Sequence, residues 1–557
     1  MSTAVPAPGA AQSRPAATPP PAQAFASALR PPPAWTITAA LAVVYLILAP
    51  QSPDLAAASY RSSLFSSAGF TLWDNSWYGG HHLLAYSVLA PALGALIGPQ
   101  PLAAISMVLA SALFERLIDG CFPARATRVS AAWFALGGSI ALLSSRVPFD
   151  LGLAVGLGAL LLARRRALAL ALAMSMLTAL ASPVAGAFLA LAFLAWALAG
   201  SARAWPAALA IAALAPIGLL TLAFPEGGSQ PFVASAFYPD LAGVLLIGAL
   251  AGPAGATLTR RALQIGVGLY ALALLGSYVL PSAVGGNVDR LGAQAAGPVA
   301  ALVLVGASRW RRRLLIVLAP FLLYWQATAP VTDFVSTLSN PSVDASYYAP
   351  LVGELRALGV GYSARPARIE VVATADHWEA RYLAPHVMIA RGWERQLDTD
   401  RNAIFYEGAT RLTAARYGAW LAANAISYVA LPLGARLDYS ARAEARLFAG
   451  GHPSYLREVW RSRHWRLFAV LDATPLAQAP ALLTGASSDS LTLEVPRPGL
   501  YEVRVHFTPY WALASGSGCV ARAAGEWTDV DARHAGRFRL IIRFSLARVL
   551  SDAPRCD

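Results

Sequence analysis

The sequence predicts a polytopic α-helical membrane protein that carries a C-terminal water-soluble part, built from an α/β domain and a β-sandwich. The 557 residues are 57% hydrophobic and only 13% charged, whereas soluble chains are about half apolar and about a quarter charged. Apolar stretches of span length repeat through residues 34–330, and arginines gather in every second connection between them. After residue 330 the pattern changes to short strand-like and helical segments.

The N-terminal segment 1–33 is rich in Pro and Ala, and its charged residues are Arg14 and Arg30. Such a composition cannot form an apolar face that would pack against a core. We therefore expect a disordered cytoplasmic tail.

The membrane region, 34–330, is predicted from the length of its apolar stretches. A helix needs about 20 such residues to cross the hydrocarbon core. The sequence contains about eleven candidate spans. They are 34–50, 102–119, 128–145, 149–163, 167–182, 184–200, 205–223, 237–254, 262–281, 291–307 and 313–330.

The arginine-rich connections predict the orientation, because cytoplasmic loops of membrane proteins carry an excess of basic residues. Residues 83–98 are apolar enough for another span, but counting them would move the later arginine clusters to the outside. We therefore predict that 83–98 form a helix along the outer surface, within a long first outer loop at 51–101. The N-terminus is then cytoplasmic, and the part after 330 is extracytoplasmic.

The soluble part divides by pattern into 331–480 and 481–557. The first mixes a helix-period stretch, TRLTAARYGAWLAANA, with strand-like runs such as RIEVVAT, ISYVALPL and WRLFAVLD, which indicates an α/β domain. The second consists of strand-like runs, in which Tyr501, Val503 and Val505 form an apolar alternation. This pattern predicts a β-sandwich module. Both Cys519 and Cys556 fall in the soluble part, where an extracytoplasmic location permits a disulfide between them.

The first outer loop, with Asp54 and the stretch LWDNSWYGGHH, concentrates acids and aromatics directly after the first span. Aromatic stacking with carboxylate hydrogen bonds is typical of sugar binding, and a carboxylate can act as general base towards a hydroxyl. The alternative is an interfacial loop whose Trp and Tyr lie at headgroup level. The candidate substrate-binding residues are Tyr60, Trp73, Trp77, Tyr78, His81 and His82. Adjacent histidines cannot both face one metal from a helix, so His81 and His82 are not predicted as metal ligands.

Two later outer connections also carry charges. Arg146 and Asp150 lie at i and i+4, and Asp289 precedes Arg290. An ion pair at the first spacing can simply support a helix start. Alternatively, the arginines bind a lipid phosphate, for which the planar guanidinium is well suited, with Asp150 and Asp289 as further substrate-binding candidates. Charges at membrane depth tend to mark function.

The sequence does not predict a nucleotide-driven pump or a soluble-type Rossmann enzyme. It has no Walker motif, no GxGxxG opening a helix after a strand and no GxSxG. It has no Cys/His cluster with zinc spacing. Its net charge of +13 is explained by basic cytoplasmic loops rather than by nucleic-acid binding.

Four features follow one another in the chain: Asp54, LWDNSWYGG, AYSVLAPALGALIG and an Arg-ended span. Their order resembles that found in the GT-C superfamily of membrane glycosyltransferases. The pattern looks most like the bacterial 6-pyruvoyl-tetrahydropterin-synthase-related membrane proteins. The resemblance implies a GT-C-like fold in a bacterial cell membrane. It also implies a polyprenyl-phosphate sugar donor and an envelope glycan or lipid acceptor on the outer face. It assigns the catalytic carboxylate to Asp54, with Asp74 as second candidate, and the donor phosphate to Arg146 or Arg290. No cofactor is certain, and a divalent metal is left open.

Two other hypotheses stand beside glycosyl transfer. A transporter or flippase of lipid-linked glycans predicts polar residues buried along a path through the spans, and the spans contain few. A non-catalytic envelope scaffold or glycan-binding membrane protein predicts that Asp54, Arg146 and Arg290 do not converge on one site. Convergence of these three side chains would favour the enzyme.

Overall fold

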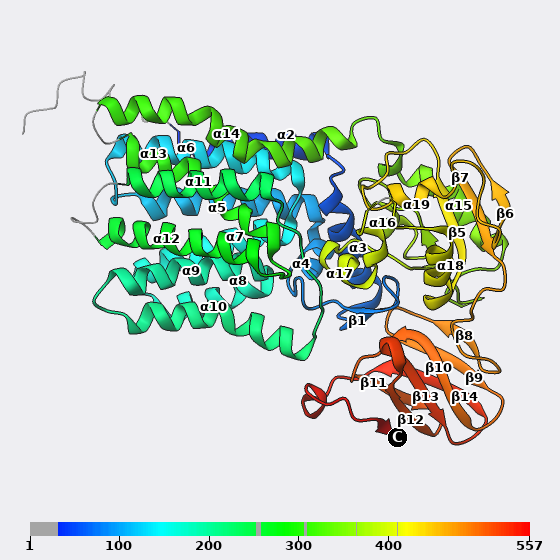
Figure 1. Cartoon of the computed structure of the whole chain (residues 1–557). Coiled ribbons are helices and arrows are strands. Elements are labelled where there is room, and N and C mark those ends of the chain that lie inside the picture. Colours follow the sequence, from blue (N-terminus) through cyan, green and yellow to red (C-terminus); the bar gives the residue numbers. More distant parts are fainter. Residues whose placement is uncertain (1–31, 252–257, 306–308, 364, 409, 557) are drawn as a thin grey trace, which may run out of the picture.

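A bundle of long helices and a soluble part that covers one end of the bundle make up the molecule (Figure 1). We call that end the outer side. The computed structural model describes residues 32–251, 258–305, 309–363, 365–408 and 410–556. The predicted tail lies outside the described residues up to residue 31.

The bundle contains a helix at each predicted span. These helices are α2 (Trp35–Leu48), α5 (Pro99–Ile118), α6 (Ala124–Ala141), α7 (Val147–Arg164), α8 (Leu168–Ala181), α9 (Pro183–Ala199), α10 (Ala204–Ala223), α11 (Ala234–Leu250), α12 (Leu258–Val279), α13 (Asp289–Leu304) and α14 (Arg309–Thr337). Among the described residues, six helices are long and apolar enough to cross a membrane, or seven if the bent pair of α2 and the helix after it counts as one span. Helices α8, α9 and α11 are apolar but shorter. The chain is therefore a multi-pass membrane protein, while the number of about eleven spans stays a prediction.

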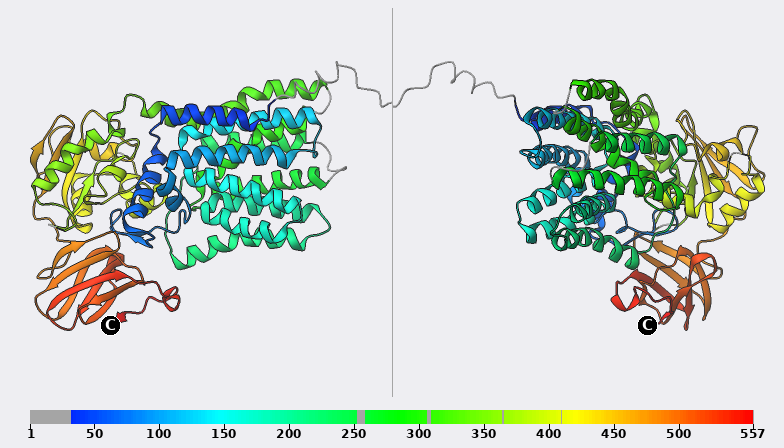
Figure 2. Two further views of the ribbon diagram at one scale, coloured as in Figure 1. Left: turned by 180° about the vertical axis from the view of Figure 1, so that it is seen from behind. Right: turned by 60° about the vertical axis from the view of Figure 1, so that its left-hand side comes forward.

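The first outer loop contains a helix that the sequence pattern did not indicate. Helix α3 (Pro53–Ala68) turns away from α2 by 79° and lies across the outer ends of the bundle (Figures 1 and 2). The bend follows from Ala49, which adopts a left-handed conformation, and from Pro53 at the helix start. Of the surface helix expected at 83–98, residues Ala90–Ile97 are helical and form α4.

The α/β domain is built on a five-stranded mixed sheet in the order β4-β3-β5-β7-β6. Strands β4, β3 and β5 are parallel, and β7 and β6 are antiparallel. The predicted strands and the predicted helix of this region are confirmed. The strands are β3 (Arg368–Val371), β4 (Met388–Ile389), β5 (Ile426–Pro432), β6 (Leu456–Arg461) and β7 (Trp465–Val470); the helices are α15 (Ala345–Ala357), α16 (Glu379–Tyr382), α17 (Arg395–Arg401), α18 (Ala414–Ala423) and α19 (Arg442–Arg446).

The C-terminal module is a sandwich of two four-stranded antiparallel sheets, β10-β13-β12-β15 and β11-β14-β9-β8. Tyr501, Val503 and Val505 point into the shared core, as their alternation predicted. The strands are β8 (Leu482–Ala486), β9 (Ser490–Val495), β10 (Gly499–His506), β11 (Trp511–Ser515), β12 (Gly518–Arg522), β13 (Trp527–Ala532), β14 (Gly536–Ile542) and β15 (Arg555–Cys556). A disulfide joins Cys519 of β12 to Cys556 of β15.

Short elements complete the fold. A two-stranded hairpin, β1 (Trp73–Asp74) and β2 (His81–His82), lies in the first outer loop. The 3-10 turns are η1 (Leu142–Ser144), η2 (Gly285–Val288), η3 (Pro341–Val343), η4 (Ala403–Phe405), η5 (Ala524–Glu526) and η6 (Leu546–Arg548).

Candidate functional site at the outer end of the bundle

A charged cluster lies at the outer end of the bundle, where α3, α7 and α14 meet. Asp54 stands in the first turn of α3, and its Oδ2 lies 3.4 Å from Nε of Arg146. Nη2 of the same arginine lies 3.8 Å from Oδ2 of Asp333 on α14. The side chains of Arg146, Asp54 and Asp333 are 25%, 27% and 28% exposed, so a molecule on the outer side can reach them.

The turn before α7 brings Arg146 to Asp54. Ser145 adopts a left-handed conformation after η1, and Arg146 follows as the first flanking residue of α7. Two contacts fasten this turn to the start of the chain. The Tyr45 hydroxyl of α2 lies 2.7 Å from Ser145 Oγ, and Ser52 Oγ donates a 2.8 Å hydrogen bond to the carbonyl of Ser144. Tyr45 and Ser52 flank the bend between α2 and α3, so the bend and the turn position the ion pair together.

Asp150 and Arg290 complete the cluster. Asp150 lies one turn into α7 and is buried, and its Oδ2 has no hydrogen-bond partner among the residues that the structure describes. Arg290 stands in the first turn of α13 and interacts electrostatically with Arg146, Asp54 and Asp150. Its guanidinium lies 5.6 Å from the ring centre of Phe149. Within the described ranges no carboxylate lies close enough to form an ion pair with Arg290, although it does interact electrostatically with the cluster.

Asp54, Arg146 and Arg290 thus converge, together with Asp150. Asp289 takes a different place. Trp325 Nε1 of α14 donates a 2.5 Å hydrogen bond to its Oδ1, and its carboxyl group also interacts with that of Asp240 on α11. Asp289 therefore joins α13 to α11 and α14 beside the cluster.

Sequence reasoning missed Tyr86 and Asp333. The Tyr86 phenol interacts with Asp54, Arg290 and Arg146, and its ring lies 4.4 Å from the guanidinium carbon of Arg61. Burial, with the charge of Asp54 second, raises the pKa of Tyr86, so its hydroxyl stays protonated and can donate. Tyr86 lies within the apolar stretch 83–98, where the pattern does not single it out. Asp333 could have been found from the sequence, because it is an acid just beyond the last predicted span.

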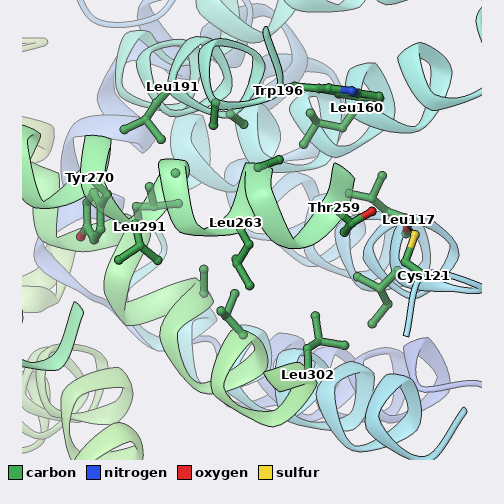
Figure 3. A pocket seen from close by; sticks show the side chains of 18 of the residues that line it. Leu117, Cys121, Leu160, Leu191, Trp196, Thr259, Leu263, Tyr270, Leu291 and Leu302 are labelled. Atoms are coloured by element: carbon green, nitrogen blue, oxygen red, sulfur yellow. Dashed lines mark hydrogen bonds between the residues drawn. The ribbon is translucent and has the colours of Figure 1, made fainter. Parts of the chain in front are cut away.

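An apolar cavity of about 500 Å³ begins beside this cluster and runs towards the opposite end of the bundle. Leu291 and Tyr270 line one end, and Leu117 and Cys121 line the other (Figure 3). Leu291 follows Arg290 directly. The cavity extends along α13 to Leu302, roughly 16 Å away at about 1.5 Å per residue, or about half of the hydrocarbon thickness. Its further lining on α13 is Gly292, Ala295, Ala296 and Val299.

The other candidates in the first outer loop are buried away from this cluster. Asp74 Oδ2 accepts a 2.8 Å hydrogen bond from the Tyr60 hydroxyl, and its Oδ1 accepts one of 2.9 Å from the Ser76 amide. Burial raises the pKa of Asp74. The ring of Tyr60 stacks on Trp77 at 4.5 Å. Asp74 and Tyr60 are therefore buried in the protein interior.

The β1–β2 hairpin connects the first outer loop to both soluble domains. The Ile389 amide of the α/β sheet donates to the Ser76 carbonyl, and Trp77 forms a bridge with the same residue. The His506 amide of the sandwich donates to the Gly79 carbonyl. At Gly80, with φ of +108°, a Cβ would approach the Trp73 ring within 2.4 Å, so glycine is required in this turn.

The remaining hairpin side chains bind other parts of the chain. Trp73 packs into the sandwich core, and the Tyr78 hydroxyl accepts a 2.8 Å hydrogen bond from the Glu394 amide. His82 Nδ1 lies 3.0 Å from Glu226 in the connection between α10 and α11. The hairpin therefore holds the bundle and the two outer domains together.

His81, also buried in the hairpin, predicts a loss of stability in acid. Burial lowers its pKa to about 3, whereas an unfolded histidine titrates near 6.5. Between these values the unfolded chain binds the proton and the native chain does not, so stability falls by roughly 1.4 kcal/mol per pH unit as the pH drops. We expect a lower melting temperature at about pH 5 than at about pH 7, and a smaller difference in His81→Gln. Thermal unfolding followed by fluorescence measures both.

The control for this prediction is His534→Gln, which changes an exposed imidazole in the sandwich module. It should retain the full wild-type difference between the two pH values. An equal acid loss in His81→Gln and wild type would contradict the role of His81.

Among residues 32–251, 258–305, 309–363, 365–408 and 410–556, no group of three or more His, Cys, Asp or Glu side chains is arranged to hold a metal ion. The carboxylates of the cluster face arginines instead.

No protein-family model and no curated protein matches the chain. The solved structures to which it is similar include those of two transferases. The arabinofuranosyltransferase AftD from mycobacteria aligns over 83% of this chain and 43% of its own, at 17% identity and a TM-score of 0.43. The oligosaccharyltransferase AglB from Archaeoglobus fulgidus aligns over 72% of this chain and 69% of its own, at 13% identity and a TM-score of 0.45. The chain therefore spans less than half of the length of AftD.

Proposed function

We propose that this protein is a membrane glycosyltransferase that moves a sugar from a polyprenyl-phosphate donor to a hydroxyl of an envelope glycan or lipid on the outer side. One observation carries the proposal: a partly exposed acid–arginine cluster lies next to an apolar cavity, since Arg290 of the cluster directly precedes Leu291 of the cavity lining on α13. A lipid-linked sugar has the same two parts, a charged head and a long hydrocarbon tail. The motif resemblance to GT-C proteins points to the same substrate class.

The donor side of the proposed site is Arg290 with the cavity behind it. A half-buried guanidinium without an ion-pair partner in the described part of the chain is suited to a phosphate, which it can bind through two parallel N–H donors. The tail would then enter the cavity past Leu291. The volume of about 500 Å³ is within the usual range for ligand pockets.

The acceptor side is Asp54. Its carboxylate is partly exposed and stands at the N-terminus of α3, where the helix dipole stabilises negative charge. Arg146 lies beside it and orients one oxygen, so the other can face an acceptor hydroxyl. Tyr86, which interacts electrostatically with both Asp54 and Arg290, supplies a neutral donor.

The proposed reaction balances with these groups. Asp54 accepts the proton of the acceptor hydroxyl, and the hydroxyl oxygen forms the new bond to the anomeric carbon. The bond from that carbon to the phosphate oxygen breaks, and the electron pair leaves on the lipid phosphate. Arg290 stabilises the charge that develops there.

A flippase would need polar groups along the path of the sugar. The cavity is lined almost wholly by apolar side chains, with Thr259 and Arg164 among the exceptions. This lining suits a hydrocarbon tail better than a sugar. We therefore favour transfer over transport.

The direct test is a transfer assay with the purified full-length protein in lipid. Polyprenyl-phosphate pentoses and hexoses are offered with envelope glycan acceptors, and released polyprenyl phosphate is measured. Release that depends on both protein and acceptor is expected. Absence of release with every donor, from protein that binds polyprenyl phosphate, would favour the scaffold hypothesis.

Arg290→Ala is expected to raise the donor KM roughly 10- to 100-fold, because a charge-assisted hydrogen bond to phosphate contributes about 1.5–3 kcal/mol. Arg290→Lys keeps the charge but loses the two-point contact, and should fall between wild type and Arg290→Ala. Steady-state kinetics with varied donor measure both. The matched control is Arg457→Ala, at an exposed position of β6; an unchanged donor KM in Arg290→Ala would remove Arg290 from the donor site.

A further inference from the structure

The chain ends in a loop that leaves the sandwich and returns to it. We call residues 543–556 the C-terminal loop: it follows β14, contains η6 and closes at β15, where the disulfide of Cys556 fastens it to β12. Arg548 donates a 2.5 Å hydrogen bond to the Ala553 carbonyl within the loop and one of 3.3 Å to the Pro509 carbonyl of the sandwich. The loop is therefore a built structure, attached at both ends.

This loop displays two leucines to its surroundings. Leu546 is 80% exposed and Leu550 is 85% exposed, and Phe544 at its base is 43% exposed. Among the described residues of the soluble part no other leucine is so exposed, Leu482 being next at 64%. Adjacent exposed apolar side chains on a structured loop indicate a contact with an apolar partner.

The loop lies beside the outer end of α10. Phe544 contacts Phe224, the residue that follows α10, with ring centres 5.7 Å apart. Tyr510 donates a 2.5 Å hydrogen bond to the carbonyl of Ala223, the last residue of α10. In Figures 1 and 2 the loop extends from the sandwich back to the level at which α10 ends. The sandwich is thereby held against the outer end of α10.

The surface of α10 next to this contact is apolar and exposed. Helix α10 is among the helices apolar and long enough to cross a membrane, and its last turns expose Leu219 by 67% and Leu222 by 58%. The base of the loop meets the end of this span at the Phe544–Phe224 contact. Tyr510, which bonds to the same end of α10, is of a type enriched at the headgroup level.

We propose that the C-terminal loop inserts Leu546 and Leu550 into the outer leaflet beside α10 and so anchors the sandwich module to the membrane. Burial in lipid removes both side chains from water, while the exposed Arg543 at the base of the loop can reach the lipid phosphates. The disulfide between Cys519 and Cys556 fixes the end of the loop to β12. The inference does not depend on sugar transfer.

The test measures the depth of nitroxide spin labels by electron paramagnetic resonance. The full-length protein carries Cys121→Ser, which removes the free thiol, and one of Leu546→Cys, Leu550→Cys or Leu500→Cys. Leu500, 60% exposed on β10 of the same module, is the matched control. The labelled proteins are placed one copy to a lipid nanodisc, and collisions with oxygen and with a water-soluble nickel chelate are compared.

Labels at 546 and 550 are expected to collide often with oxygen and several-fold less with the nickel chelate than the label at 500. Equal access of the nickel chelate at all three positions would show a loop in water and overturn the proposal. Labels at 546 and 550 that are immobile and shielded from both agents would show a protein contact in place of lipid, and would overturn it as well. Because all three leucines are exposed, the labels should not disturb folding, and monodisperse elution checks this.

Discussion

Asp54→Asn is expected to lower the rate of sugar transfer on the order of 10²- to 10⁴-fold, the usual contribution of a general base. Asparagine has nearly the same shape but cannot accept the proton of the acceptor hydroxyl. The fold should be retained, because the carboxylate of Asp54 is partly exposed and Arg146 keeps its contact with Asp333. Initial rates at saturating donor, with the melting temperature of the same samples, measure both effects.

Two further variants make this result specific. Asp531→Asn changes an exposed carboxylate on β13 and should leave the rate unchanged. Asp74→Asn replaces one of two buried oxygens that each accept a hydrogen bond with an NH2 group that can only donate, so it should lower the melting temperature while the rate per folded molecule stays close to that of wild type. A wild-type rate in Asp54→Asn, or a rate lost in Asp74→Asn at full stability, would move the catalytic assignment away from Asp54.

Arg391→Met is expected to destabilise the α/β domain by about 3–5 kcal/mol, the usual effect of removing one partner from a buried ion pair. Arg391 is buried and forms a two-point contact with Asp398, at 2.6 Å and 3.1 Å. Its Nη1 also lies 3.9 Å from Glu370 and 3.8 Å from Glu444. Burial raises the pKa of both glutamates, that of Glu444 to about 7. Methionine would leave three buried carboxyl groups without a cation.

Resistance to limited proteolysis and the unfolding midpoint of the soluble part measure this effect. Arg457→Met, at an exposed position of β6, should leave both unchanged. Adding Asp398→Asn to Arg391→Met removes the carboxylate charge that Arg391 contacts most closely and should recover part of the stability. Full stability of Arg391→Met would show that the domain does not depend on this arginine.

The aromatic hairpin shows where a sequence pattern supports two interpretations. Trp73, Trp77 and Tyr78 next to acids are typical both of a sugar-binding surface and of a tightly packed interior. The pattern contains no information on what lies opposite these rings. The structure places the sandwich core against Trp73 and the α/β domain against Trp77 and Tyr78, more than 300 residues away in sequence.

The amino-acid sequence by itself determined the features that depend on neighbours along the chain. The apolar lengths of the membrane helices, the change of pattern after residue 330 and the alternation in strands such as β10 follow from local periodicity. Tertiary structure alone decided which charges meet. Asp54, Arg146, Asp333 and Arg290 come from four helices, and a bend after α2 and a left-handed Ser145 bring the first two together. Such convergence depends on helix packing over distances that no local pattern encodes, and for the same reason Tyr86 and the C-terminal loop became recognisable only in the folded chain.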